Sequence, residues 1–187
     1  MKYVIDDYSF EGIIYKPIDP KELKDYCVKW KKSLTRAERR ALRKYREQMT
    51  SINNINAKLR KGIVSDDAKI ISSALQKAVL PENIIVYRRL ARAENNEMKE
   101  KEIGEYVVVS DFKGTHVGKE IKEIGLKGPC AGYMFLLLSE NIHAAYINDL
   151  SLWHRNEHEL LIDKNKKLLL LDKFKLFKKD GYVVKVQ

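Results

Sequence analysis

The pattern of apolar residues changes near residue 81, and this change constrains the fold more than any other feature of the chain. Before it, apolar residues recur at the spacing of amphipathic helices, in stretches that span 21–34, 34–49, 52–62 and 65–83. After it come short runs rich in Val, Ile, Leu, Tyr and Phe, at 83–90, 105–112, 132–138, 158–163, 166–177 and 181–186. Helices and strands that are segregated along a chain are typical of an α+β fold rather than of a wound parallel sheet.

Local signals support the predicted helices. Thr35, followed by Glu38, has the spacing of a capping box, and Ser65 is a good N-cap for the last helix of the first half. In the second half, the charged stretch 91–102 is expected to be a loop, and 118–125 a short helix. The sequence therefore predicts helices and strands joined by polar connections.

Length and composition agree with one domain. The chain has 187 residues, 44% of them hydrophobic, which is enough apolar material for a packed core. The border near residue 81 is a change of element type, with no linker composition around it. We expect a single domain over 1–187, with a helical lobe at about 20–81 and a β core at about 82–187.

The charge balance limits the classes of partner. With 36 Lys and Arg against 26 Asp and Glu, the formal charge of +10 favours nucleic acid, a membrane surface, an acidic protein or a phosphorylated cofactor, and it also fits a merely soluble basic surface. Cys27 and Cys130 form neither a disulfide framework nor a zinc motif, and we expect two buried free thiols.

The N-terminus does not read as a signal peptide. Asp6 and Asp7 stand where its apolar region would be, and the longest apolar runs, such as 168–171, are too short to span a bilayer. If the protein is secreted, its signal has been removed or its export route does not use one.

Three short motifs contain residues that could carry chemistry. Arg88 and Arg89 end a predicted strand, and because neighbouring strand residues face opposite ways, only one of them can point into a cleft, where a guanidinium can grip a phosphate. The alternative is a pair of surface arginines. The second motif, at 110–118, passes from a predicted strand into a tight turn that contains His116, a weak candidate for a ligand or a base. The histidines show no metal-ligand spacing, so we expect no metal.

The third motif is the pair Glu157 and Glu159. A Glu-X-Glu pair is most often a solvated strand edge, but this one follows a polar loop that contains Trp153 and leads directly into an apolar run. If both glutamates lie in a strand, they point to the same side. Two carboxylates in a cleft could stabilise a developing cation and deprotonate an incoming nucleophile.

The order of these motifs resembles the mono-ADP-ribosyltransferase toxins of the Arg, Ser-Thr-Ser, Glu-X-Glu class. Aromatic-Arg on one strand is followed by aromatic-X-small-Thr-X on a second and by Glu-X-Glu after a loop. The helical half is similar too, since it contains a Leu-Thr-X-X-Glu stretch and then Ile-Asn-X-X-Leu-Arg. The resemblance covers about residues 20–187 and extends to both the binary actin-modifying toxins and the Rho-modifying exoenzymes.

The resemblance implies a helical lobe packed on a two-sheet, sandwich-like β core, with NAD as substrate in the cleft between them and no metal. It implies that Glu159 stabilises the ion formed as nicotinamide leaves, that Glu157 activates the acceptor, and that Trp153 recognises the target protein. The residues expected to contact NAD are Arg88 and Arg89 at the phosphates, together with Tyr45, Asn56, Arg60, Gly114 and Thr115.

One departure from the family pattern concerns the catalytic glutamate. Gly114-Thr115-His116 replaces Ser-Thr-Ser, so the first serine, which normally braces that glutamate, is missing. Either Thr115 or a water takes over its role, or activity is reduced.

The resemblance implies a toxin that transfers ADP-ribose from NAD to an arginine of a host protein such as actin, with NAD hydrolysis as a side activity. Glu157 favours arginine, because the Rho-modifying relatives carry Gln there. The alternatives are a Rho-type GTPase or a nucleic-acid base as acceptor, and a catalytically weak or dead binding module. The sequence has no recognition helix or RNP-like motif, which argues against a nucleic-acid partner. We expect a secreted monomer, with or without a separate delivery component, that acts in the host cytosol.

Overall fold

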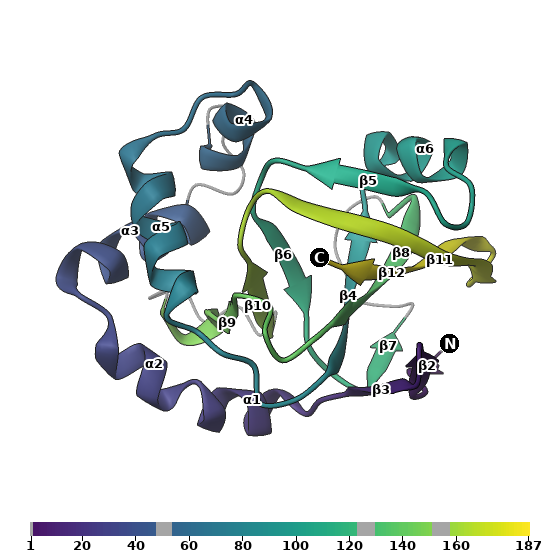
Figure 1. Cartoon of the computed structure of the whole chain (residues 1–187), viewed down its shortest axis with the longest axis horizontal. Coiled ribbons are helices and arrows are strands. Elements are labelled where there is room, and N and C mark those ends of the chain that lie inside the picture. The colour runs from purple at the N-terminus through teal and green to yellow at the C-terminus, as the bar shows by residue number, and fades with distance from the viewer. Residues whose placement is uncertain (1, 48–53, 123–129, 151–157) are drawn as a thin grey trace.

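The structure is a computed structural model that describes residues 2–47, 54–122, 130–150 and 158–187 (Figure 1). Five helices lie together on one side of the molecule, and a sixth lies apart, beside the far end of the strands. Their bounds are α1 (Pro20–Tyr26), α2 (Val28–Ser33), α3 (Arg36–Glu47), α4 (Ile55–Arg60), α5 (Asp66–Gln76) and α6 (Arg92–Glu100).

The capping signals in the sequence start the helices as expected. Ahead of α3, the Thr35 amide donates to Glu38 Oε2 at 2.7 Å and the Glu38 amide donates to Thr35 Oγ1 at 3.2 Å, which completes the capping box. Ser65 caps α5 by accepting from the Ala68 amide. The first predicted helix is divided, because Cys27 ends α1 and begins α2.

Strands make up most of the remaining described residues. They are β1 (Lys2–Val4), β2 (Tyr8–Phe10), β3 (Ile13–Pro17), β4 (Ile84–Leu90), β5 (Tyr106–Val109), β6 (Lys113–His116), β7 (Glu120–Lys122), β8 (Gly132–Leu138), β9 (Ala144–Tyr146), β10 (Glu159–Ile162), β11 (Lys166–Leu176) and β12 (Lys179–Val186). A short 3-10 helix, η1 (Asn148–Leu150), follows β9.

The strands form two unequal sheets. Ten of them follow the order β5-β11-β12-β8-β4-β6-β10-β9, with β3 beside β4 and β2 beside β3, and β1 and β7 form a separate pair. The pairs β8/β12 and β3/β4 are parallel, and the others are antiparallel. This mixed sheet with helices gathered on one side confirms the predicted α+β fold.

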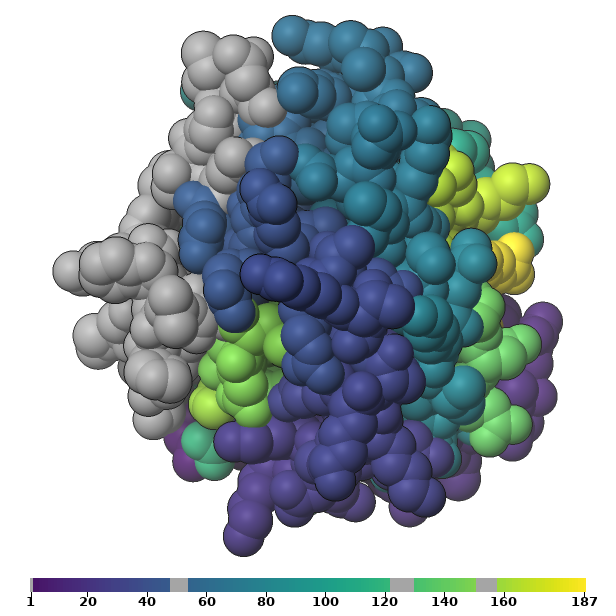
Figure 2. Space-filling model, turned by 90° about the vertical axis from the view of Figure 1, so that its left-hand side faces the viewer, coloured from purple at the N-terminus to yellow at the C-terminus, as the bar shows by residue number. Residues whose placement is uncertain are grey.

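A continuous hydrophobic core joins the helices to the sheet. Leu42 of α3, Leu75 of α5 and Leu161 of β10 are all completely buried in one cluster. A second cluster, around Tyr15, Ile85 and Tyr87, includes the residues of β4 that alternate with those of the first cluster. Both faces of β4 are therefore covered, and the helices cover most of the side shown in Figure 2.

Three predictions about local structure were wrong. The stretch 92–100 is the helix α6 and not a charged loop; its start is stabilised because Glu94 accepts a hydrogen bond from the Ala91 amide, and Met98 is buried. Residues 120–122 form β7, paired with β1, where we expected a helix, and the rest of that expected helix lies mostly outside the described residues. Residues 113–116 form the strand β6 and not a tight turn, because they pair with β10.

Two further observations bear on the sequence analysis. Both cysteines are free thiols, but only Cys27 is buried, and Cys130 is partly exposed. None of the helices in the described ranges is both long enough and apolar enough to cross a membrane.

Candidate active site

The pairing of β6 with β10 brings two of the sequence motifs together. Leu161 lies opposite Gly114, and Glu159 lies opposite His116. The Glu159 side chain reaches diagonally over Gly114, so that a Cβ added at this glycine would lie 2.6 Å from Glu159 Oε1. The missing side chain at position 114 therefore makes room for the carboxylate of Glu159.

The backbone at the start of β10 is fixed on both sides. Ile147 donates to the Glu159 carbonyl and Val117 donates to the His158 carbonyl, each at 3.0 Å. His158 has φ = 46°, in the left-handed region that is uncommon for non-glycine residues, and its Nδ1 lies 3.0 Å from Tyr146 Oη. That Glu157 and Glu159 point to the same side stays a prediction. Glu157 and Trp153 lie outside the described residues.

A buried ion pair holds the Glu159 carboxylate from the side of the helices. Arg46 Nε of α3 lies 3.3 Å from Glu159 Oε2, and the two side chains are only 3% and 5% exposed. Arg46 Nη1 also donates to the backbone carbonyls of Ile147, at 3.4 Å, and of Asn148. The guanidinium thus ties α3, the segment after β9 and the carboxylate together.

Arg88 reaches the same place from β4. Its Nη1 donates to the Gly114 carbonyl at 2.8 Å, and its Nε and Nη2 donate to Glu94 Oε1 of α6 at 3.3 and 3.1 Å. Lys113 Nζ also lies 3.1 Å from that oxygen. Arg89, the next strand residue, shares the opposite face of β4 with Tyr87. Of the two arginines, Arg88 is therefore the one next to Gly114.

The ionic contacts continue to α4. Lys113 Nζ lies 3.1 Å from Asp111 Oδ1, and Arg60 Nη1 donates to Asp111 Oδ2 at 2.6 Å. Two carboxylates, those of Asp111 and Glu94, thus join three cations, those of Arg60, Lys113 and Arg88. The surplus of positive charge and the partial exposure of Arg88 and Arg60 suit an anionic ligand.

Asn56 joins the helical lobe to the segment that precedes β6. Its Nδ2 donates to the Phe112 carbonyl at 2.9 Å, and its Oδ1 accepts from the Phe112 amide at 3.1 Å. The same Nδ2 donates to Tyr45 Oη at 3.1 Å. Burial raises the pKa of Tyr45, and the negative charge of Glu159 adds to this effect, so Tyr45 stays protonated. The predicted residues Tyr45, Asn56 and Arg60 thus border the same region.

Thr115 does not take over the role expected of the missing serine. Its hydroxyl donates to the Leu160 carbonyl at 3.0 Å, and the residue is only 1% exposed. Its position alternates with that of Gly114 in β6, so the two residues face opposite ways. In this structure the group that contacts the Glu159 carboxylate from α3 is Arg46.

We expect Glu94 to make stability depend on pH in the acid range. Burial raises its pKa, but the charges of Arg88 and Lys113, with the hydrogen bonds from Lys113 and the Ala91 amide, outweigh burial and lower it from 4.5 to about 2. Because the folded state has the lower pKa, Glu94 stabilises it fully above pH 4.5 and loses this contribution as the pH falls towards 2. Thermal unfolding of Glu94→Gln should therefore vary less than that of wild type over this window. The control is Glu97→Gln, an exposed residue of α6; an equal change in both variants would contradict the assignment.

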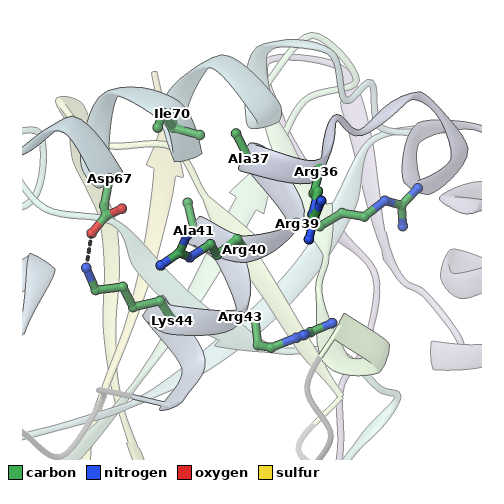
Figure 3. Close-up of a pocket in the computed structure, with 9 residues that line it drawn as sticks. All are labelled: Arg36, Ala37, Arg39, Arg40, Ala41, Arg43, Lys44, Asp67 and Ile70. Carbon is green, nitrogen blue, oxygen red and sulfur yellow. Dashed lines mark hydrogen bonds and ion pairs between the residues drawn. The ribbon is translucent and has the colours of Figure 1, made fainter.

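A separate hollow of about 980 Å³ lies on the outer side of α3 (Figure 3). Arginine side chains and Lys44 extend around it, and Lys44 turns towards Asp67 of α5. Tyr45 and Arg46 are buried on the inner side of the same helix. Although this hollow is large, we do not assign the active site to it, because the Arg46–Glu159 ion pair and Tyr45 lie on the other side of α3.

Four charged residues of the site were missed by the sequence analysis: Arg46, Glu94, Asp111 and Lys113. Only Arg46 gave a usable signal, since it continues the stripe of Leu42 and Tyr45 at helical spacing, where an apolar residue is usual. Within the ranges that the structure describes, no group of three His, Cys, Asp or Glu side chains could hold a metal ion.

Comparison with known structures shows the same fold in bacterial toxins. C3stau2 from S. aureus, solved with NAD, is 17% identical, with 92% of this chain and 98% of that chain covered and a TM-score of 0.71. The C3 exoenzyme of Clostridium limosum is also 17% identical, with 92% of this chain and 97% of that chain covered and a TM-score of 0.71. BECa, an ADP-ribosylating toxin of a binary enterotoxin of C. perfringens solved with NADH, is 19% identical with a TM-score of 0.74. The match covers 100% of this chain but 56% of BECa.

Sequence comparison assigns the family. No curated protein sequence matched the chain. The family model described as ADP-ribosyltransferase exoenzyme matches residues 24–127, which is more than half of the 187 residues. The match includes α3, α4, β4 and β6, which carry most of the site described above. The chain belongs to the ADP-ribosyltransferase exoenzyme family.

Proposed function

We propose that the protein is an NAD-dependent mono-ADP-ribosyltransferase that acts as a toxin on a host protein. The observation that carries this proposal is the meeting of Glu159, Gly114 and Arg88 at one place, where a buried carboxylate lies beside a partly exposed guanidinium. In this arrangement the carboxylate can stabilise a developing cation, and the guanidinium can bind a diphosphate. The family membership and the NAD bound in C3stau2 support it.

Each half of the site suits one part of NAD. Arg88, Lys113 and Arg60 supply the positive charge for the diphosphate, and Tyr45 and Asn56 border the adenosine side, as the family resemblance implies. A second contact with the phosphates, from Arg89, stays a prediction. The planar guanidinium of Arg88 can form paired hydrogen bonds with phosphate oxygens.

The carboxylate of Glu159 serves the chemical step. The bond between C1′ of the ribose and the nicotinamide nitrogen breaks, and nicotinamide leaves with the bonding electron pair. The positive charge left on the ribose exists only near the transition state, where a nearby carboxylate stabilises it more than it stabilises bound NAD. An acceptor nitrogen then bonds to C1′ and gives up a proton; water in its place yields free ADP-ribose.

We propose an arginine of a host protein, such as actin, as the acceptor. Glu157 supports arginine, since a carboxylate can both pair with a guanidinium and remove its proton, and the Rho-modifying relatives carry Gln at the matching position. A Rho-type GTPase is the alternative acceptor. We also propose that the protein is secreted and acts in the host cytosol as a single catalytic domain.

A catalytically weak NAD-binding module is the second candidate function. It is favoured by Gly114, where the family pattern has serine, and by the guanidinium of Arg46, which counters the charge of Glu159. Retention of Arg88 and both glutamates favours the enzyme.

Incubation with radiolabelled NAD, with and without host-cell lysate, tests the proposal. We expect nicotinamide release by the protein alone and label on a lysate protein, with the bond cleaved by neutral hydroxylamine, as arginine linkages are. A hydroxylamine-resistant bond would instead indicate another acceptor residue. Absence of both nicotinamide release and label would refute the enzyme and leave the binding module, which equilibrium dialysis with NAD detects.

A further inference from the structure

Burial of the Arg46–Glu159 ion pair costs desolvation free energy, and a purely structural role does not explain why this cost is accepted. Taking a guanidinium and a carboxylate out of water is expensive, and apolar side chains of similar size usually give equal or better stability. Both side chains are nearly inaccessible, and Arg46 lies among the apolar residues of the buried stripe of α3. A buried charge pair that includes the residue proposed for the chemistry therefore points to a role in that chemistry.

The two oxygens of the Glu159 carboxylate are confined from different directions. Oε2 faces Arg46 Nε at 3.3 Å. Oε1 occupies space next to Gly114, 2.6 Å from where a Cβ would be. An added side chain at position 114 and the present contact with Arg46 cannot both be accommodated without movement of the carboxylate. Arg46 and Gly114 thus act together on the position of Glu159.

The guanidinium is itself held firmly enough to position another group. Its Nη1 donates to the carbonyls of Ile147 and Asn148, and Ile147 in turn donates its amide to the Glu159 carbonyl. The same short segment therefore anchors both the guanidinium and the backbone of the residue that it contacts. This closed set of contacts fixes the distance between Arg46 and Glu159.

We propose that Arg46 is a positioning residue for Glu159: its guanidinium holds the carboxylate in place and directs it into the space that Gly114 leaves. This inference rests on the proposed function, in which Glu159 stabilises the cation at C1′. Arg46 acts through Glu159, and it does not need to contact NAD. Arg46 therefore contributes to the rate of nicotinamide release more than to the binding of NAD.

Kinetics of nicotinamide release test this division. Arg46→Gln should lower kcat by about 10- to 100-fold, as expected for a displaced catalytic group, and change KM for NAD by less than about threefold. Arg46→Lys keeps the charge and should lose less. The matched control is Arg43→Gln, an exposed arginine of the same helix, which should stay within about twofold of wild type. Equal losses in Arg43→Gln and Arg46→Gln, or a change in KM alone, would overturn the inference.

The Gly114→Ser variant supplies a second measurement. In wild type the new Cβ displaces a carboxylate that Arg46 holds, so kcat should fall. In Arg46→Gln the carboxylate loses the contact with the guanidinium and is less confined, so Gly114→Ser should cost less there, and the combined loss should be smaller than the product of the two separate losses. Losses that simply multiply would show that the two positions act independently, which contradicts the proposal.

Thermal unfolding separates a folding defect from a positioning effect. Arg46→Gln leaves the Glu159 charge buried without this partner and should lower the melting temperature, while Arg46→Gln combined with Glu159→Gln should recover part of the loss. If Arg46→Gln is largely unfolded, Arg46→Lys carries the kinetic test. If folded Arg46→Gln has the same kcat as the wild-type protein, only the positioning role is refuted. If the wild-type protein itself releases no nicotinamide, the proposed function is refuted as well.

Discussion

Glu159→Gln should lower the rate of nicotinamide release by about 10²- to 10³-fold, which corresponds to ~2.7–4 kcal/mol of transition-state stabilisation. The amide has nearly the same shape as the carboxylate but no negative charge, so it cannot stabilise the cation at C1′. The effect should be large because Glu159 is only 4% exposed, and water cannot easily replace the lost charge at this depth. Initial rates at saturating NAD measure it.

The same substitution should also destabilise the protein. It leaves the buried guanidinium of Arg46 beside a neutral amide, and breaking a buried pair typically costs ~3–5 kcal/mol. Activity must therefore be compared below the melting temperature of the variant, with Glu97→Gln on the surface of α6 as the neutral control. Release within about tenfold of wild type by folded Glu159→Gln would remove this residue from the chemical step.

Glu157→Gln should separate the two activities that Glu159→Gln removes together. Its carboxylate is proposed to orient the acceptor arginine and take its proton, a task that typically contributes 10²- to 10⁴-fold. Transfer to protein should fall by about that amount, while nicotinamide release in the absence of acceptor should stay within about threefold of wild type. Parallel assays of label on protein and of free nicotinamide give the comparison. Loss of both activities would assign Glu157 to cleavage of NAD and not to the acceptor.

The sequence predicted the helical side of the fold well because its helices carry local signals. The capping box at Thr35 and Glu38 and the cap at Ser65 form as expected, since each depends on residues three positions apart. The division at Cys27 was not visible, because the residues around it keep helical spacing on both sides of the break.

The strands and the site depend on contacts between distant residues, and there the sequence was less informative. Gly114 and Thr115 lie in a strand because β10 pairs with them, although Lys-Gly-Thr-His has the composition of a turn. Glu94 contacts Arg88 of β4 because residues 92–100 fold into the helix α6, although the stretch 91–102 looked like a charged loop. These partners become evident only when the chain is folded.

Most of the residues that the family resemblance marks as contacts of NAD lie together in the structure. Arg88, Gly114, Tyr45, Asn56 and Arg60 lie in one connected region around Glu159, although their roles stay predictions. Arg46 continues the buried stripe of Leu42 and Tyr45, but it was missed because it stands in a helix rich in arginines, most of which face solvent.

The close approach of Glu159 to Gly114 also has an evolutionary consequence. A serine gained at position 114 would be harmful while Arg46 holds the carboxylate, but less harmful once Arg46 has been lost. The effect of one mutation therefore depends on which residue changed first. For a lineage that has the glycine and arginine together, the change to serine at position 114 and the loss of Arg46 should cost less in combination than the two separate effects suggest. Relatives of this chain should consequently show positions 46 and 114 changing together.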